Sequence, residues 1–146
     1  MLPRVLALLL FALLLAPAAQ SSDLIEKLDG RTVRSILGDL GFTGSEIDTD
    51  DDVIVSMQGY RVLVVVGSDK GRSLMARFAI SGTGATLRSM NDWNRTKRYS
   101  RAYLDDDGDP VLESDLDLDG GVHRKRVEDF FRTFDGTLRL FLRHIE

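Results

Sequence analysis

Acidic side chains that could bind a cation occur in two turn-like segments of the sequence. Segment 115–120 reads Asp-Leu-Asp-Leu-Asp-Gly, with carboxylates at alternate positions before a glycine, as in the first half of a calcium-binding loop. Such loops carry a bidentate glutamate at their twelfth position, which is Arg126 here. Segment 105–109 is also acidic, but Tyr103 occupies its first ligand position. These segments are compatible with weak, nonspecific cation binding, but they predict no specific metal site.

Residues for nucleophilic or general-base chemistry are scarce. The chain has two histidines, His123 and His144, and no cysteine. It contains no Gly-x-Ser-x-Gly, no His-Glu-x-x-His and no glycine-lysine phosphate loop. Its carboxylates lie in expected turns and on polar strand faces, whereas tuning of a carboxyl pKa requires burial among apolar residues. The sequence therefore predicts a protein that is not an enzyme, with no catalytic residue, no cofactor and no metal.

The composition is that of one folded domain. The 146 residues are 43% hydrophobic and 29% charged. With 19 Lys+Arg against 23 Asp+Glu, the net charge of −4 offers no chain-wide attraction for nucleic acid. The absence of cysteine excludes disulfides and thiolate zinc sites. Stability must therefore come from an apolar core.

The N-terminal residues have the pattern of a secretory signal peptide. Arg4 precedes an apolar run over 5–15, and small residues follow at 16–19. The run is about a dozen residues long, short of the roughly 20 that span a bilayer as a helix. We expect residues 1–19 to be cleaved, which leaves a single domain over 20–146 that is periplasmic or secreted and has no stable membrane anchor. An uncleaved anchor remains the alternative.

The mature chain shows alternating helix and strand patterns. Val62 to Val66 is apolar at every position, which predicts a mid-sheet strand covered on both faces. The order of patterns predicts an α+β fold with an antiparallel sheet of about five strands and flanking helices, in the order α-β-β-β-α-β-β-α. The expected helices are 33–40, 86–95 and a long one ending at Ile145, and the expected strands are 53–57, 60–66, 73–80, 99–105 and 111–118.

The last expected helix has two unusual features. It opens with His123, Arg124, Lys125 and Arg126, so cations lie at the positive end of the helix dipole. We expect the aspartates at 115, 117 and 119 to compensate them, with an anionic partner as the alternative. An apolar stripe over 127–145 predicts packing across the protein's own sheet, and a homodimer through this helix is the alternative.

Several short motifs in the second half of the chain resemble the YbjN-domain family of bacteria. They are Asn-Asp-Trp-Asn at 91–94, Tyr-Ser-Arg-Ala-Tyr-Leu-Asp at 99–105, Asp-Gly-Asp at 107–109, Leu-Glu-Ser-Asp at 112–115 and Gly-Gly-Val at 120–122. The resemblance implies a fold similar to type III secretion chaperones and a role in sensory transduction regulation. It implies no enzymatic activity and no catalytic residue.

The same motifs contain the candidate partner-binding residues. Trp, Tyr and Arg side chains dominate binding hot spots. A structural role is the alternative, in which Trp93 and Tyr103 belong to the core and the Asn94 amide fastens a turn. We expect a non-enzymatic exported interaction or regulatory module that binds an unidentified polypeptide, with a periplasmic metal- or ligand-binding protein that uses the acidic turns as the alternative. The candidate residues are Trp93, Asn94, Tyr99, Arg101, Tyr103 and Arg124.

Overall fold

The computed structural model describes residues 24–66 and 69–146, so the expected signal peptide lies outside the described residues. None of the helices in this part of the chain is long and apolar enough to cross a membrane. The helices are α1 (Gly30–Asp39), α2 (Leu87–Thr96) and α3 (Arg124–Ile145). The strands are β1 (Glu46–Ile47), β2 (Val53–Met57), β3 (Tyr60–Val65), β4 (Ser73–Ala79), β5 (Arg101–Leu104) and β6 (Pro110–Asp117).

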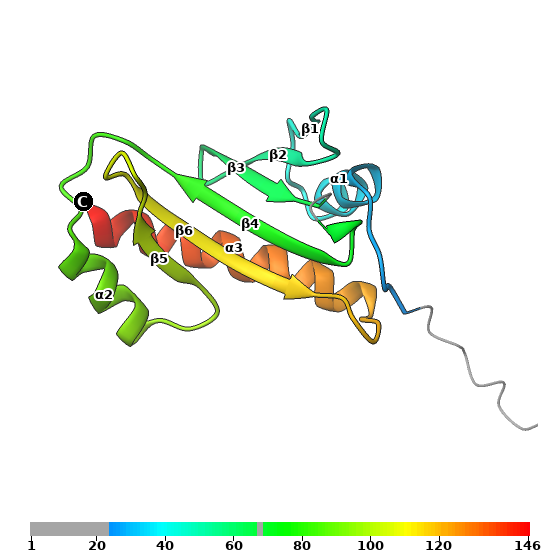
Figure 1. Ribbon diagram of the computed structural model, residues 1–146. Helices are drawn as coiled ribbons and strands as arrows, with labels where there is room; N and C mark the ends of the chain where they lie inside the picture. Colours follow the sequence, from blue (N-terminus) through cyan, green and yellow to red (C-terminus); the bar gives the residue numbers. More distant parts are fainter. Residues whose placement is uncertain (1–23, 67–68) are drawn as a thin grey trace, which may run out of the picture.

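The strands form one antiparallel sheet in the order β1-β2-β3-β4-β6-β5 (Figure 1). The segment β2-β3-β4 is a meander of neighbouring strands. The chain then passes through α2, places β5 at the sheet edge, and returns as β6 between β5 and β4. This architecture confirms the α+β class and the expected element order, with the two-residue strand β1 in addition.

Alternate side chains of the strands and one face of each helix form a single core. Phe78 of β4, Phe141 of α3 and Trp93 of α2 meet edge to face, with ring centroids 6.5 Å apart for the first pair and 5.1 Å for Trp93 and Phe141. The long helix α3 runs behind the sheet in Figure 1. Its apolar stripe is therefore used within the protein, as the sequence predicts, and the homodimer remains a prediction. The buried residues of α3 are Val127, Phe130, Phe131, Phe134, Leu138, Phe141 and Ile145.

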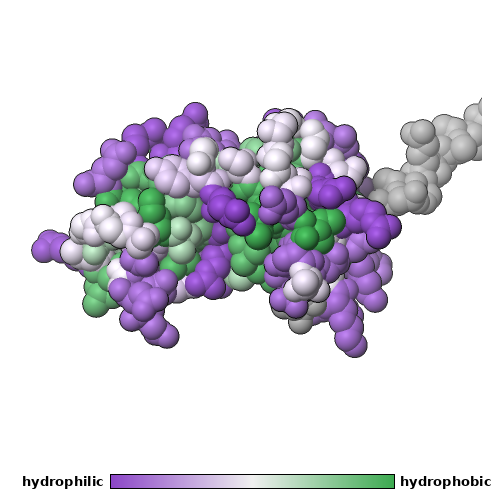
Figure 2. All heavy atoms as spheres, turned by 90° about the horizontal axis from the view of Figure 1, so that it is seen from above, coloured by the Kyte–Doolittle hydropathy of each residue, from purple (hydrophilic) through white to green (hydrophobic). Residues whose placement is uncertain are grey.

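The opposite face of the sheet is only partly covered. Val62 and Val64 of β3 are fully buried, whereas Leu63 and Val65, which alternate with them, are half-buried. The expected mid-sheet position of this strand is confirmed, but the expectation of cover on both faces is wrong, because the helices pack on one face. Seen from above, hydrophobic side chains reach the surface in patches separated by hydrophilic ones (Figure 2).

Local chemistry explains where the two shorter helices begin. Asp29 precedes α1, and its carboxylate accepts a hydrogen bond from the backbone N–H of Thr32 at 2.7 Å. A hydrogen bond from the Thr32 side chain, together with this backbone bond, lowers the pKa of Asp29. Thr86 precedes α2 and forms a reciprocal capping box with Ser89. In each helix the side chain of the capping residue thus accepts a hydrogen bond from one of the free N-terminal N–H groups.

The basic start of α3 is compensated differently from the expectation. Arg124 binds Asp39 at the end of α1, at 2.6 Å, and Glu128 one turn along α3, at 2.8 Å. Two of the aspartates that were expected to compensate these cations pair elsewhere: Asp115 with Arg101 and Asp119 with Arg72. The expectation is wrong because Asp115 and Asp119 pair with other arginines, whereas α1 packs against α3 and brings Asp39 to Arg124.

Candidate functional site

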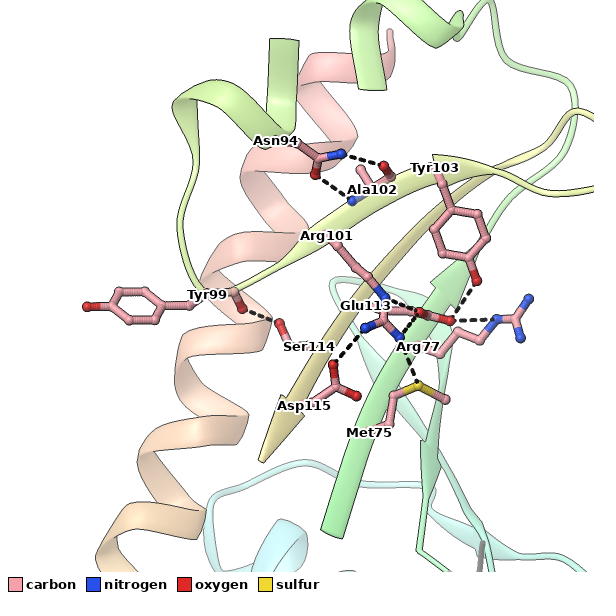
Figure 3. A network of polar contacts seen from close by, with 10 residues as sticks. All are labelled: Met75, Arg77, Asn94, Tyr99, Arg101, Ala102, Tyr103, Glu113, Ser114 and Asp115. Atoms are coloured by element: carbon pink, nitrogen blue, oxygen red, sulfur yellow. Dashed lines mark hydrogen bonds and ion pairs between the residues drawn. The ribbon is translucent and has the colours of Figure 1, made fainter. Parts of the chain in front are cut away.

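A polar cluster lies on the outer face of the sheet around Glu113 of β6 (Figure 3). Nε and Nη2 of Arg101 on β5 lie 2.8 and 2.7 Å from Glu113 Oε2. The Tyr103 hydroxyl donates to Glu113 Oε1 at 2.7 Å. Nε of Arg77 on β4 lies 3.6 Å from the same oxygen. Both carboxylate oxygens therefore have donors, and three strands are joined at one side chain.

Glu113 is the only charged residue among the buried positions of the described chain, at 3% exposure. Its burial was not predicted, because the sequence pattern indicates that the carboxylates lie in turns and on polar strand faces. The sequence feature that could have indicated this burial is a glutamate in the otherwise apolar first residues of the strand, Pro-Val-Leu-Glu. Arg101 and Tyr103 lie on the neighbouring expected strand. Burial and the hydrogen bond to Glu113 raise the pKa of Tyr103. The Glu113 hydrogen bond likewise raises the pKa of Arg101.

Arg101 links this buried cluster to the exposed surface. Its Nη1 lies 3.1 Å from Oδ2 of Asp115, whose side chain is 53% exposed. Its Nη2 lies 3.9 Å from the sulfur of Met75. The guanidinium therefore spans a buried and an exposed carboxylate on the same strand. This arrangement neutralises charge and holds β5 against β6.

Asn94 and Trp93 of α2 have structural contacts. The Asn94 amide donates to the backbone C=O of Ala102 and accepts from its N–H, both at 2.8 Å. Trp93 is fully buried, and its Nε1–H donates to the Ser100 hydroxyl at 3.1 Å. Trp93 thus lies in the core and Asn94 fastens β5 to α2, which is the structural alternative that the sequence left open.

Tyr99 marks the point where the chain enters β5. Its backbone has a left-handed φ of 63°, a conformation that non-glycine residues rarely adopt. Its C=O accepts a hydrogen bond from the Ser114 hydroxyl of β6. Its side chain is 73% exposed. The fold therefore fixes the Tyr99 backbone while leaving the phenol on the surface.

A cavity of about 570 Å³ opens beside Tyr99, between the β5–β6 edge and α3. Buried Phe130 and Phe134 lie at its α3 side, together with the exposed side chains of Arg126 and Thr133. This volume lies within the range of pockets that accept small molecules or several side chains of a peptide. The strand side is lined by Tyr99, Ser100, Arg101, Glu113, Ser114 and Asp115.

The structure brings only some of the predicted residues together. Tyr99 and Arg101 line the cavity, and Tyr103 joins Arg101 through Glu113. Arg124 does not line it and instead pairs with Asp39. The cavity residues on α3 were not predicted, because an amphipathic pattern does not show which helix positions border a gap.

The acidic turns use their carboxylates internally. Asp105 accepts hydrogen bonds from the N–H groups of Asp107 and Asp109. Asp117 accepts the N–H of Asp119, which itself pairs with Arg72. Within residues 24–66 and 69–146, no three His, Asp or Glu side chains are grouped so that they could hold a metal ion. The geometry therefore gives no specific support to the cation-binding alternative.

Comparison with known proteins places the chain in a family. No curated protein matches its sequence. The crystal structure of YbjN from E. coli is similar, with a TM-score of 0.58 and 17% identity over 76% of this chain and 85% of that one. The Yersinia pestis type III secretion chaperone SycH, solved with a fragment of YscM2, gives 0.51 and 15% identity over 72% and 92%. The sequence profile described as "Putative bacterial sensory transduction regulator" matches residues 30–146, so the chain belongs to the YbjN family.

Proposed function

We propose that this protein is a non-enzymatic regulatory module of the bacterial cell envelope that binds a polypeptide. The cavity between the β5–β6 edge and α3 carries the proposal. It combines an apolar floor at Phe130 and Phe134 with the exposed aromatic side chain of Tyr99 and the cations of Arg101 and Arg126. Tyr and Arg around an apolar centre are typical of protein-binding surfaces.

The comparisons support this proposal at the level of fold. The family description refers to sensory transduction regulation, and the fold is shared with SycH, whose structure was solved with a polypeptide fragment bound. A shared fold does not by itself carry a function to this chain. The proposal therefore depends on the cavity, and the fold adds a precedent for polypeptide binding.

The chemistry around the cavity favours binding over catalysis. Glu113, the buried carboxylate, is surrounded by Arg101, Tyr103 and Arg77 and is engaged as an ion pair. Asp115, the other carboxylate that Arg101 contacts, is also engaged in an ion pair, so Arg101 holds both carboxylates in structural contacts.

Photo-crosslinking in cells tests the polypeptide binding. A photo-reactive amino acid at Tyr99 or at Thr133 would be placed on opposite sides of the cavity, while the same group at Leu87, 75% exposed on α2, serves as the matched control. We expect one defined polypeptide to crosslink from both cavity positions and not from Leu87. Crosslinks that are equal at all three positions would contradict the proposal.

Location in the envelope is tested separately. The expected signal peptide over 1–19 predicts that the exported protein begins near Gln20. Fractionation followed by mass spectrometry of the N-terminus measures this directly. A full-length protein confined to the cytoplasm would contradict the envelope part of the proposal and leave the binding part to its own test.

A further inference from the structure

One half of β6 has a neighbouring strand on one side only. Strand β4 pairs with β6 from Val111 to Asp117, whereas β5 pairs with it only from Pro110 to Glu113. The half from Ser114 to Asp117, here called the open edge, therefore has no strand beside it on the β5 side within the described chain. It lies at the cavity, since Ser114 and Asp115 are among the lining residues.

Alternate backbone groups of the open edge point away from β4. The backbone N–H and C=O of Ala102 form hydrogen bonds with Asn94 and so point away from β6. The backbone groups of its two neighbours in β5, Arg101 and Tyr103, therefore point toward β6. Their partners in the ladder are Glu113 and Val111. Backbone direction alternates along a strand. The N–H and C=O groups of Asp115 and Asp117 therefore face the uncovered side.

The fold closes one part of this sheet border and leaves the other part open. Asn94 satisfies the outer groups of Ala102, which prevents another strand from pairing with β5 there. The bond from Ser114 holds the C=O of Tyr99 at β6, and the left-handed φ of Tyr99 interrupts the extended backbone there, so the residues before Tyr99 do not continue β5 along β6. The gap beside the open edge is therefore a fixed feature that β5 does not fill.

The side chains around the open edge define what would fit. Asp115 and Asp117 are exposed on the outer face, and the apolar side chains of Phe130 and Phe134 lie on the α3 side of the cavity. Successive side chains of an added strand would point alternately to these two sides. A segment with alternating basic and apolar side chains would place its basic groups beside Asp117 and Asp115, the latter shared with Arg101, and its apolar groups beside the phenylalanines.

A second copy of this chain is a poor occupant. Two open edges pairing with each other would bring Asp115 and Asp117 of one copy next to the same residues of the other. Like charges on opposed strand positions are destabilising. The charge pattern therefore favours a partner segment that carries Lys or Arg.

We propose that the open edge of β6 takes up an extended segment of a partner polypeptide, with alternating basic and apolar side chains, as an added β-strand. This inference rests on the proposed polypeptide binding and specifies how the segment is held. Main-chain hydrogen bonds to Asp115 and Asp117 supply a sequence-independent part of the affinity, and the two faces supply specificity.

Defined peptides test the proposal on the purified full-length protein. The probe is an eight-residue peptide of alternating Val and Lys with blocked ends, and its charge-reversed control alternates Val and Glu. We expect the Val-Lys peptide to bind about tenfold or more tightly than the control. Amide exchange at Asp115 and Asp117 should slow on binding, while Leu116, paired with Leu74 of β4, should already exchange slowly without peptide.

N-methylated peptides separate strand addition from other modes of binding. An added strand uses only alternate amides toward the edge, so methylation of one set should abolish binding and methylation of the other set should leave it. Equal effects of the two methylated peptides would overturn strand addition without touching the proposed function. The variant Asp117→Lys should bind the Val-Lys peptide about tenfold more weakly than the wild type and should bind the Val-Glu peptide more tightly.

Two further results would overturn the inference. One is failure of the Val-Lys peptide to bind while crosslinks from Tyr99 and Thr133 still report a polypeptide at the cavity. The other is protection of the Asp115 and Asp117 amides before any peptide is added, whether through a second copy or through residues before Leu24. Loss of the crosslinks themselves would instead count against the proposed function.

Discussion

Arg101 and Glu113 occupy directly opposed positions of β5 and β6, and two guanidinium nitrogens of Arg101 contact a single oxygen, Oε2, of Glu113. The other oxygen is thereby left to Tyr103 and Arg77. A carboxylate with every oxygen engaged is stable when buried, because its lost hydration is replaced by donors. This pair is the centre of the polar cluster on the outer face.

Replacing Glu113 should destabilise the protein. Glu113→Gln keeps the shape of the side chain but removes the charge that Arg101, Arg77 and Tyr103 all contact. We expect the free energy of unfolding to fall by about 1–3 kcal/mol in urea denaturation. The control is Asp115→Asn, which removes an exposed partner of the same Arg101 and should cost less than about 1 kcal/mol. Equal losses in the two variants would contradict the central role of Glu113.

Asn94→Ala should weaken the attachment of β5. The variant removes both hydrogen bonds to Ala102 and leaves its N–H and C=O free at the sheet border. We expect a loss of about 1–2 kcal/mol in thermal or chemical unfolding. Asn91→Ala changes an exposed amide at the start of the same motif and should have little effect. A similar loss at Asn91 would show that the Asn94 bonds are not the cause.

Stability at high pH should depend on Tyr103. Burial and the bond to Glu113 raise its pKa above the usual 10.0, so the folded protein holds the phenol proton more tightly than the unfolded chain. This contribution is complete below about pH 10 and is lost as pH rises through the folded-state pKa. The stability advantage of the wild type over Tyr103→Phe should therefore shrink in urea titrations above pH 10. Tyr99→Phe is the control, and an equal decline there would contradict the assignment.

Two glycines should respond to alanine in opposite ways. Gly71 has a φ of 78°, and a Cβ there would lie 2.1 Å from the backbone oxygen of Leu28. Gly71→Ala should therefore lower the free energy of unfolding by about 2 kcal/mol or more. Gly136 lies within α3 with no atom within 4 Å of an added Cβ. Gly136→Ala should raise stability by about 1 kcal/mol, and the same sign for both would refute this explanation.

The element order could be predicted because its signals are local. Alternation in 73–80 and 111–118 and the turn chemistry at 106–110 are properties of neighbouring residues. Strand β1 was missed as a separate element because its two residues are held by pairing with Val53 and Ile54 and not by a pattern of their own.

The polar site could be predicted only in part. Tyr99, Arg101 and Tyr103 were selected from their residue types, but the burial of Glu113 depends on the register between β5 and β6, which one sequence does not display. The pairing of Arg124 with Asp39 joins residues 85 positions apart. Periodicity locates faces of elements, whereas such contacts depend on how the elements are placed against each other.

The return of β6 to the side of β4 also sets an order for folding. The meander from Val53 to Ala79 needs only short loops to close, but β4 gains its second neighbour only after α2, β5 and the following turn have been made. Contacts between distant segments are costly to close and slow folding. Until residues 110–117 are in place, β4 is itself a sheet edge with apolar side chains on one face. A chain that pauses at this stage would be prone to pair with other molecules, and this exposure would end only when residues 110–117 cover the edge of β4.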